Sequence, residues 1–155
     1  MLKRDRHWMV EALRLAEKAY SLGEVPVGAI VVQIGEANRI VGRGYNQREQ
    51  LKDPTAHAEM LAITAAANTL GDWRLPDCVL YVTKEPCPMC AGAIVNSRLS
   101  GVVFGCYDEE QGCCGSLYQL PNDPRFGQNI FIRGGVEEER SLELIRDFFR
   151  SRRTV

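Results

Sequence analysis

The sequence has no long apolar segment and almost no net charge. No apolar run approaches the roughly 18 residues that a membrane-spanning helix needs, and the charged residues 1–6 lead into no apolar signal-peptide core. The net charge of −1 excludes a domain that is basic over its whole surface. We therefore expect a cytoplasmic protein that does not associate with a membrane.

Internal repeats and low-complexity linkers are also absent, so residues 1–155 are expected to form a single domain. A chain of this length can bury a core without disulfides. With no signal peptide and one Cys-x-x-Cys motif, metal binding by some cysteines is a better interpretation than a disulfide framework. The six cysteines are Cys78, Cys87, Cys90, Cys106, Cys113 and Cys114.

Basic residues are concentrated at the two ends of the chain. The N-terminal group is Lys3, Arg4 and Arg6, and the C-terminal group is Arg140, Arg146, Arg150, Arg152 and Arg153. If the two ends meet in the fold, they would form a local patch for a polyanion. Charge alone favours the alternative, in which both groups are solvated helix faces.

Hydrophobic periodicity and turn residues predict four helices and five strands. Asp53 and Pro54 are expected to be the N-cap and first position of the second helix, and Pro86 is expected to start the third. On the last helix, Leu142, Ile145 and Phe149 have helical spacing on the apolar side, with Phe148 beside them. The expected helices are 5–21, 53–70, 86–97 and 137–153, and the expected strands are 27–32, 39–44, 78–82, 101–105 and 130–132.

The order of these elements predicts an α/β fold with three layers, α/β/α. The first two strands are expected to form an antiparallel hairpin, and the βαβ units that follow should make the remaining strands parallel. The central sheet is therefore expected to be mixed and five-stranded.

The Cys-x-x-Cys motif begins a predicted helix. Cys87 and Cys90 are three residues apart and should project from one face. The positive end of the helix dipole favours thiolates there, and two thiolates suit zinc. Alone, the motif is as consistent with a redox pair or with chance as with a metal site.

A second motif, His57-x-Glu59, also begins a predicted helix. A lone histidine at such a position is more often structural than catalytic. Glu59 lies about 200° around the helix axis from His57, which makes it a neighbour of a metal rather than a ligand.

The two motifs together are much more specific than either one. Each helix follows a strand, so His57, Cys87 and Cys90 should meet at one edge of the sheet, where open α/β folds bind ligands. Three protein ligands and an open fourth position indicate a catalytic zinc site with one ion per chain, whose water would ionise near neutral pH. Glu59 would move protons from that water to the substrate and its leaving amine. This arrangement is the signature of zinc-dependent nucleobase deaminases.

Beyond this signature, the sequence resembles the bacterial tRNA-specific adenosine deaminases of the cytidine-deaminase-like superfamily over nearly its whole length. The resemblance implies hydrolytic deamination of the wobble adenosine in a tRNA anticodon stem-loop, giving inosine and ammonia, and it implies a homodimer. The segments that carry it are residues 24–29, 44–46, 53–60, 102–105, 115–116 and 148–150.

The resemblance also assigns substrate-binding residues. Asn46 would contact the purine edge, Val27 and Ala58 would line the base pocket, and the backbone near Ala58 and Cys87, with Pro86 beside it, would help to place the base. From the residues alone, a turn role after a strand is the favoured interpretation of Asn46, and ordinary core packing is the alternative for Val27 and Ala58.

Further positions match the family's RNA-contacting residues. Asp108 would lie near the sugar of the anticodon loop, although a solvated loop acid is an equal alternative. The RNA-receiving C-terminal helix would contribute Phe149, Arg150, Arg152 and Arg153, where the arginines suit phosphate contacts and the phenylalanines could instead anchor the helix in the core. The apolar stretch Ala91–Val95 could belong to a dimer interface or to the core.

Three alternatives remain open at this point. A deaminase of a free nucleobase, nucleoside or nucleotide would use the same zinc and the same Glu59. A binding module with structural zinc would need a fourth protein ligand and no Glu59, and a metal other than zinc could occupy the site. Cys113 and Cys114, which have no assigned role, are interpreted as small, packed loop residues.

Overall fold

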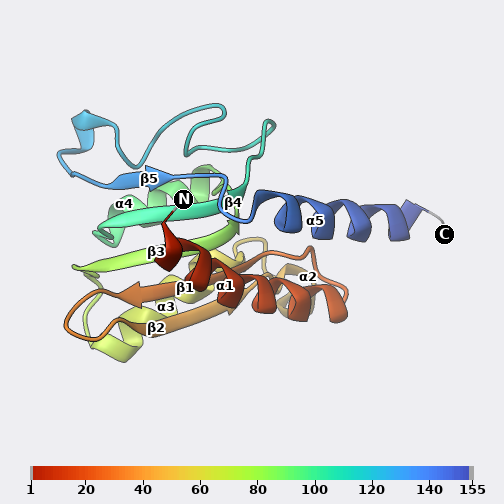
Figure 1. The fold of residues 1–155 in the computed structure, drawn as a ribbon, viewed down its shortest axis with the longest axis horizontal. Coiled ribbons are helices and arrows are strands. Elements are labelled where there is room, and N and C mark those ends of the chain that lie inside the picture. The colour runs from red at the N-terminus through yellow and green to blue at the C-terminus, as the bar shows by residue number, and fades with distance from the viewer. Residues whose placement is uncertain (1, 154–155) are drawn as a thin grey trace.

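The computed structural model describes residues 2–153, except for the side chain of Arg153. A five-stranded sheet lies between two layers of helices (Figure 1), which confirms the predicted three-layer architecture. None of the helices in the described residues is long and apolar enough to cross a membrane. The elements are α1 Lys3–Ser21, β1 Gly28–Gln33, β2 Arg39–Tyr45, α2 Arg48–Leu51, α3 Ala58–Leu70, β3 Cys78–Lys84, α4 Pro88–Asn96, β4 Gly101–Cys106, the 3₁₀ turn η1 Pro124–Phe126, β5 Phe131–Arg133 and α5 Glu138–Arg153.

The strand order is β2-β1-β3-β4-β5. β1 pairs antiparallel with both β2 and β3, whereas β3, β4 and β5 are parallel to one another. The predicted hairpin and the predicted parallel strands are therefore both confirmed. Because β2 and β3 are each antiparallel to β1, they run in the same direction and end at the same edge of the sheet.

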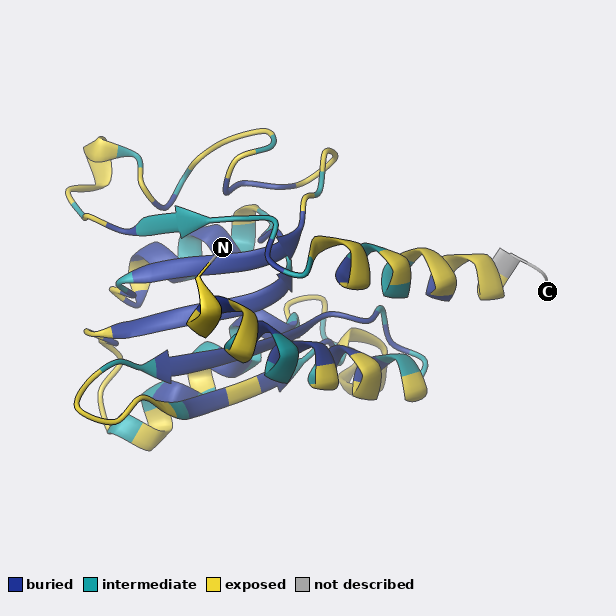
Figure 2. Ribbon diagram, in the orientation of Figure 1, coloured by how far each residue is buried: buried dark blue, intermediate teal, exposed yellow. Residues whose placement is uncertain are grey.

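The central strands are buried along most of their length (Figure 2). Their alternate residues fill two separate cores. Ala29 and Val31 of β1 belong to the core that α3 and α4 cover, and Ile30 and Val32 belong to the core that α1 covers. A strand that is buried on both faces reads as a continuous apolar run, which is why the segment around β1 was recognisable in the sequence.

Both metal-motif helices begin later than the prolines predicted. α3 begins at Ala58, and the carboxylate of Asp53 accepts hydrogen bonds from the backbone and hydroxyl of Thr55. Asp53 therefore stabilises a turn before the helix and is not its N-cap, so that prediction was wrong. α4 begins at Pro88, two residues after Pro86. The short helix α2 was not predicted, because four residues are too few to show a hydrophobic period.

The apolar side of α5 also differs from the prediction. Phe148 is buried and packs edge-to-face with Tyr20 of α1 at a centroid distance of 5.7 Å, whereas Phe149 is 45% exposed. Phe148 follows the buried Ser141 by seven residues, so the two share one helix face at a spacing of two turns. Phe148, not Phe149, anchors the helix.

Close contact between α3 and β2 requires glycine at position 42. A Cβ atom added to Gly42 would lie 2.3 Å from the carbonyl oxygen of Ala62. We expect Gly42→Ala to lower the free energy of unfolding by about 1–3 kcal/mol, because the helix must shift away from the sheet. Urea denaturation measures the change. Gly35→Ala is the control, since nothing lies within 4 Å of that added Cβ, and equal stabilities of the two variants would contradict this packing.

Candidate active site

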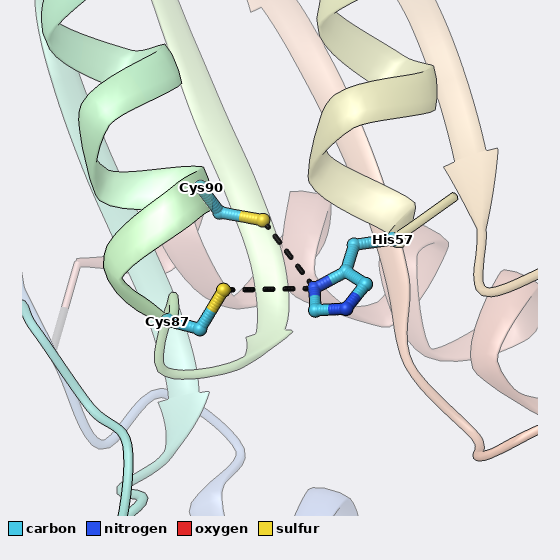
Figure 3. A group of neighbouring side chains, drawn as sticks. All are labelled: His57, Cys87 and Cys90. Carbon is cyan, nitrogen blue, oxygen red and sulfur yellow. Dashed lines mark hydrogen bonds between the residues drawn. The ribbon is translucent and has the colours of Figure 1, made fainter. Parts of the chain in front are cut away.

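The two metal motifs meet at the sheet edge where β2 and β3 end. His57 is the N-cap of α3, Cys87 is the N-cap of α4, and Cys90 lies in the first turn of α4. Their side chains point into the space between the two helix N-termini (Figure 3). His57 and Cys87 thus occupy the two N-cap positions, whereas the sequence predicted that these helices start at Asp53 and Pro86.

The donor atoms of these three residues have the spacing of a zinc site. Nδ1 of His57 lies 3.6 Å from Sγ of Cys87 and 3.6 Å from Sγ of Cys90, and all the donor atoms lie within 4.8 Å of one another. Sulfur and nitrogen ligands at tetrahedral zinc distances would be about 3.6 Å apart. The described residues contain no other such group of three or more metal-binding side chains. The chain therefore has a zinc-binding site of His57, Cys87 and Cys90.

Electrostatics at the site favour a thiolate. Hydrogen bonds from Cys90 and then from His57 lower the pKa of Cys87 to about 4, against the opposing effect of burial. The interaction with Cys87 and burial raise the pKa of Cys90. Zinc binds cysteine in the thiolate form, so its binding would release the thiol protons of these two residues.

Glu59 lies beside the metal residues as the second residue of α3. The side chain is buried, and burial raises the pKa of its carboxyl group. A raised pKa makes the carboxylate a stronger proton acceptor, which suits a residue that takes protons from water and passes them on.

A cavity of about 300 Å³ opens in front of Glu59 and the metal residues. Such a volume lies at the small end of the range for ligand pockets. Val27, Asn46, Ala58, Asp108 and Phe149 all line it, so the structure brings these predicted substrate-binding residues together.

Asn46 and Pro86, two of the predicted substrate-binding residues, also make hydrogen bonds that stabilise the fold. Asn46 lines the cavity, and its Oδ1 also accepts a hydrogen bond from the backbone N–H of Arg48 at 3.0 Å, which is the turn role weighed above. Pro86 is buried and does not line the cavity. Its carbonyl oxygen accepts a hydrogen bond from the N–H of Cys113.

The predicted RNA-contacting arginines do not line this cavity. Arg150 lies 3.9 Å from Asp147 on the exposed side of α5. Arg152 donates a hydrogen bond to the carbonyl oxygen of Gly23 and lies over the ring of Phe148. Arg153 was also predicted to contact RNA, but its side chain lies outside the described part of the chain.

Arg152 nevertheless lines a second cavity, of about 500 Å³, that adjoins the first. The two cavities share Val25, Asn46, Arg48 and Phe149. The second cavity therefore lies between the first cavity and the basic end of α5.

Sequence reasoning missed several cavity-lining residues. Lys84 forms an ion pair with Asp108 at 3.1 Å. Burial opposes the charge of Asp108, but Lys84 and backbone N–H donors outweigh it and lower the pKa of that carboxyl group. Lys84 and Glu85 could have been predicted as site residues, because they stand at the end of a strand directly before the Cys-x-x-Cys motif. The missed residues are Val25, Arg48, Lys84, Glu85, Glu110 and Gln111.

Comparison with known proteins agrees with this geometry. Residues 2–106 match the family model of the cytidine and deoxycytidylate deaminase zinc-binding region. The chain is 46% identical over 152 residues to the tRNA-specific adenosine deaminase of Bacillus subtilis (strain 168), covering 98% of this chain and 92% of that protein. The chain belongs to the tRNA-specific adenosine deaminase family.

Solved structures of this family and its neighbours share the fold. A structure from a study of A-to-I editing by tRNA:A34 deaminases at the wobble position is 38% identical, with a TM-score of 0.82 over 89% of this chain and 98% of that one. A guanine deaminase from Bacillus subtilis is also 38% identical, but the match covers 69% of this chain and 66% of that one, with a TM-score of 0.61.

Removal of one ligand should abolish zinc binding. We expect Cys90→Ser to reduce the zinc content of the purified protein from about one ion per chain to nearly none, because the hydroxyl group does not ionise as the thiol does. Metal analysis measures this. Cys113→Ser is the matched control, since Cys113 is buried and its Sγ donates to the carbonyl oxygen of Gln111. Loss of zinc in the control would make Cys113 a fourth ligand and contradict the three-ligand site.

Proposed function

We propose that this protein hydrolyses adenosine to inosine at the wobble position of a tRNA anticodon stem-loop and releases ammonia. The observation that carries the proposal is the buried Glu59, which lines one cavity of about 300 Å³ together with His57 and Cys87 of the zinc site. Membership of the tRNA-specific adenosine deaminase family supports the choice of substrate.

The metal and Glu59 have separate tasks in the proposed reaction. Zinc held by the three ligands would lower the pKa of a water molecule so that hydroxide is available near neutral pH. The carboxylate of Glu59 takes a proton from the attacking water and delivers it to the purine ring. Glu59 then takes the remaining proton of that water, which is now on the hydroxyl group bonded to the purine carbon, and delivers it to the amine. The C–N bond breaks, ammonia leaves and the carbonyl group of inosine forms, so one side chain serves as general base and general acid.

The cavity walls supply binding and orientation. Val27 and Ala58 present apolar surfaces from β1 and α3, against which a purine can lie. Asn46 offers an amide for the polar edge of the base. A base inside this cavity must leave the stack of its own loop, and an anticodon loop supplies such splayed bases at low cost.

Arginine side chains beside the two adjoining cavities support an RNA substrate. Arg48 borders both cavities, and Arg152 borders the second. Cations at these places suit the phosphates on either side of the reacting nucleotide, because phosphate contacts supply much of the affinity for nucleic acids. A free base has no phosphate to place there.

A second candidate is a deaminase of a free purine base. The 38% identity to a guanine deaminase favours it, although that match covers only 69% of the chain. Such an enzyme would use the same zinc and Glu59, so only the substrate distinguishes the two.

The test offers both kinds of substrate to the zinc-loaded protein. An anticodon stem-loop with adenosine at the wobble position, the same loop with adenosine moved into the stem, free adenosine and free guanine are incubated in parallel. Inosine in the wobble loop alone supports the proposal. Turnover of guanine or adenosine with the RNA unchanged would replace it with the second candidate.

Glu59 can be tested separately from the metal. We expect Glu59→Gln to keep its zinc and to lower kcat by about 10²–10⁴ or more, because the amide cannot carry the protons. Rapid-quench measurement of inosine formation, together with zinc analysis, gives both quantities. Glu36→Gln, at an exposed position in the β1–β2 hairpin, should match the unsubstituted protein. Near-normal kcat in Glu59→Gln would exclude the proposed proton transfers.

Arg48 should contribute to RNA affinity through charge. It forms no ion pair within the described residues, so its charge is available to a phosphate. We expect Arg48→Ala to raise KM for the stem-loop and to reduce the slope of log KM against log salt by about 1. The control is Arg43→Ala on the exposed side of β2. An unchanged salt slope in Arg48→Ala would rule out the phosphate contact.

We also propose, from family membership, that the protein is a cytoplasmic homodimer. The stretch Ala91–Val95 contributes only part of a surface, because Ala91, Ile94 and Val95 are buried in the core of their own chain. Gly92 faces open space and leaves room for a second copy to approach α4. Sedimentation velocity distinguishes a dimer from a monomer.

A further inference from the structure

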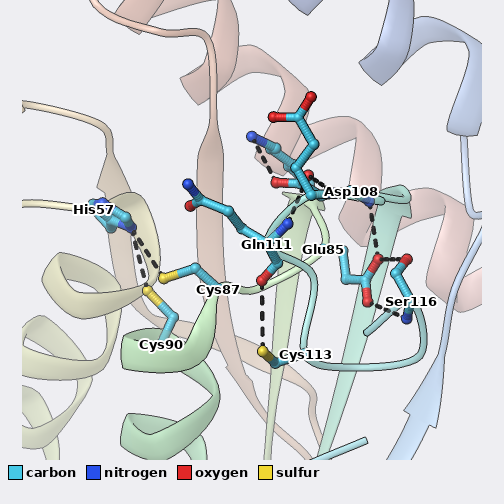
Figure 4. Close-up of polar contacts among 10 residues, drawn as sticks. His57, Glu85, Cys87, Cys90, Asp108, Gln111, Cys113 and Ser116 are labelled. Carbon is cyan, nitrogen blue, oxygen red and sulfur yellow. Dashed lines mark hydrogen bonds and ion pairs between the residues drawn. The ribbon is translucent and has the colours of Figure 1, made fainter. Parts of the chain in front are cut away.

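Glu85 is a buried carboxylate that the proposed reaction does not use. It follows β3, is 2% exposed and lies two residues before Cys87. One oxygen, Oε1, accepts hydrogen bonds from the N–H of Asp108 at 2.9 Å and from the hydroxyl of Ser116. The other, Oε2, accepts from the N–H groups of Cys114 at 3.1 Å and of Ser116 at 2.9 Å. Figure 4 shows the contacts of Glu85 with Asp108 and Ser116.

These four donors use the full accepting capacity of an ionised carboxylate. Three of them are backbone N–H groups of the segment 108–116, which lies outside the named helices and strands. Cys114 is buried and the other two residues are partly buried. N–H groups in such places that lack strand or helix partners need another acceptor, and Glu85 provides it. Gly112 packs directly on this carboxylate, since a Cβ added there would lie 2.3 Å from Cδ of Glu85.

The same segment forms one wall of the active-site cavity. Asp108, Glu110 and Gln111 line the cavity, and Oδ1 of Asp108 accepts hydrogen bonds from the N–H groups of Glu110 and Gln111. The hydrogen bond that Glu85 accepts from the N–H of Asp108 therefore holds the first residue of a locally bonded turn. Glu85 thus fixes the backbone from which these three side chains project, alongside the ion pair between Asp108 and Lys84.

We propose that Glu85 is a positioning residue, which fixes the cavity wall of residues 108–111 through segment 108–116 and thereby sets the affinity for the substrate. The groups assigned to the chemistry lie on other elements: Glu59 and His57 on α3, and Cys87 and Cys90 on α4. A loosened wall should therefore weaken substrate binding more than it slows the bond-breaking step. The kinetic part of this inference rests on the proposed function, whereas the structural part does not.

The test compares Glu85→Gln with a matched control, Asp123→Asn. Glutamine keeps the shape of the side chain but turns an NH₂ group towards backbone N–H donors. Asp123 also accepts a backbone hydrogen bond, from Arg125, in the same long connection before β5, and it does not line the cavity. Ser116→Ala removes a single donor from Oε1 and serves as the milder variant if Glu85→Gln does not fold.

Two readouts are measured on zinc-loaded protein. Amide hydrogen exchange without substrate should show at least about tenfold faster exchange at Asp108, Cys114 and Ser116 in Glu85→Gln, and unchanged exchange there in Asp123→Asn. Steady-state kinetics on the wobble stem-loop should show a KM raised about tenfold and a kcat within about twofold. Ser116→Ala should show both effects at smaller amplitude.

Each contrary result has a distinct meaning. Unchanged exchange in both Glu85→Gln and Ser116→Ala would overturn the claim that Glu85 holds the segment. Faster exchange with unchanged KM would overturn the link between the wall and affinity, and a loss of kcat at unchanged KM would place Glu85 in the chemistry. If the unsubstituted protein itself fails to convert the stem-loop, the proposed function fails, and the exchange data still decide the role of Glu85.

Discussion

Two helix N-termini meet at one edge of the sheet, and the rest of the site depends on this meeting. It follows from the pairing of β1 with both neighbours, which makes β2 and β3 run in the same direction. Gly44 of β2 allows the start of α3 to approach, because a Cβ there would lie 2.4 Å from the carbonyl oxygen of Ala58. The positive ends of α3 and α4 then face one space, which favours the thiolates that a zinc ion needs.

Buried carboxylates organise the walls around that space. Glu24 is 1% exposed and accepts hydrogen bonds from the N–H groups of Glu49 and Gln50 in α2, which follows Asn46 on one side of the cavity. Glu85 holds the segment that carries Asp108 on another side. Burial raises the pKa of the Glu59 carboxyl group, and this residue is the one assigned to proton transfer. Three glutamates that look alike in the sequence thus have different roles, and the hydrogen-bond partners of each one determine its role.

The sequence was sufficient to predict the sheet and the zinc ligands, for physical reasons. Strands buried on both faces are continuous apolar runs, and two motifs that follow strands of the same direction lie at one edge of the sheet. Helix starts were less predictable, because His57 and Cys87 act as N-caps without the side-chain hydrogen bonds that make a cap recognisable.

Long-range contacts account for the remaining differences between expectation and structure. Whether Phe148 or Phe149 is buried depends on the angle at which α5 meets α1, and neighbouring residues of one helix do not reveal it. The bond between Glu85 and Ser116 joins residues 31 apart in the chain. No local pattern marks such a pair, although the position of Glu85 directly before the Cys-x-x-Cys motif was a hint.

The most direct test of the central claim, a three-ligand zinc site with a fourth position open to substrate, is zinc X-ray absorption spectroscopy of the metal-loaded protein. The account predicts two sulfur ligands at about 2.3 Å and two nitrogen or oxygen ligands at about 2.0 Å, one of which is exchangeable solvent. A third sulfur ligand, or four ligands that all come from the protein, would show a closed structural site and contradict the account.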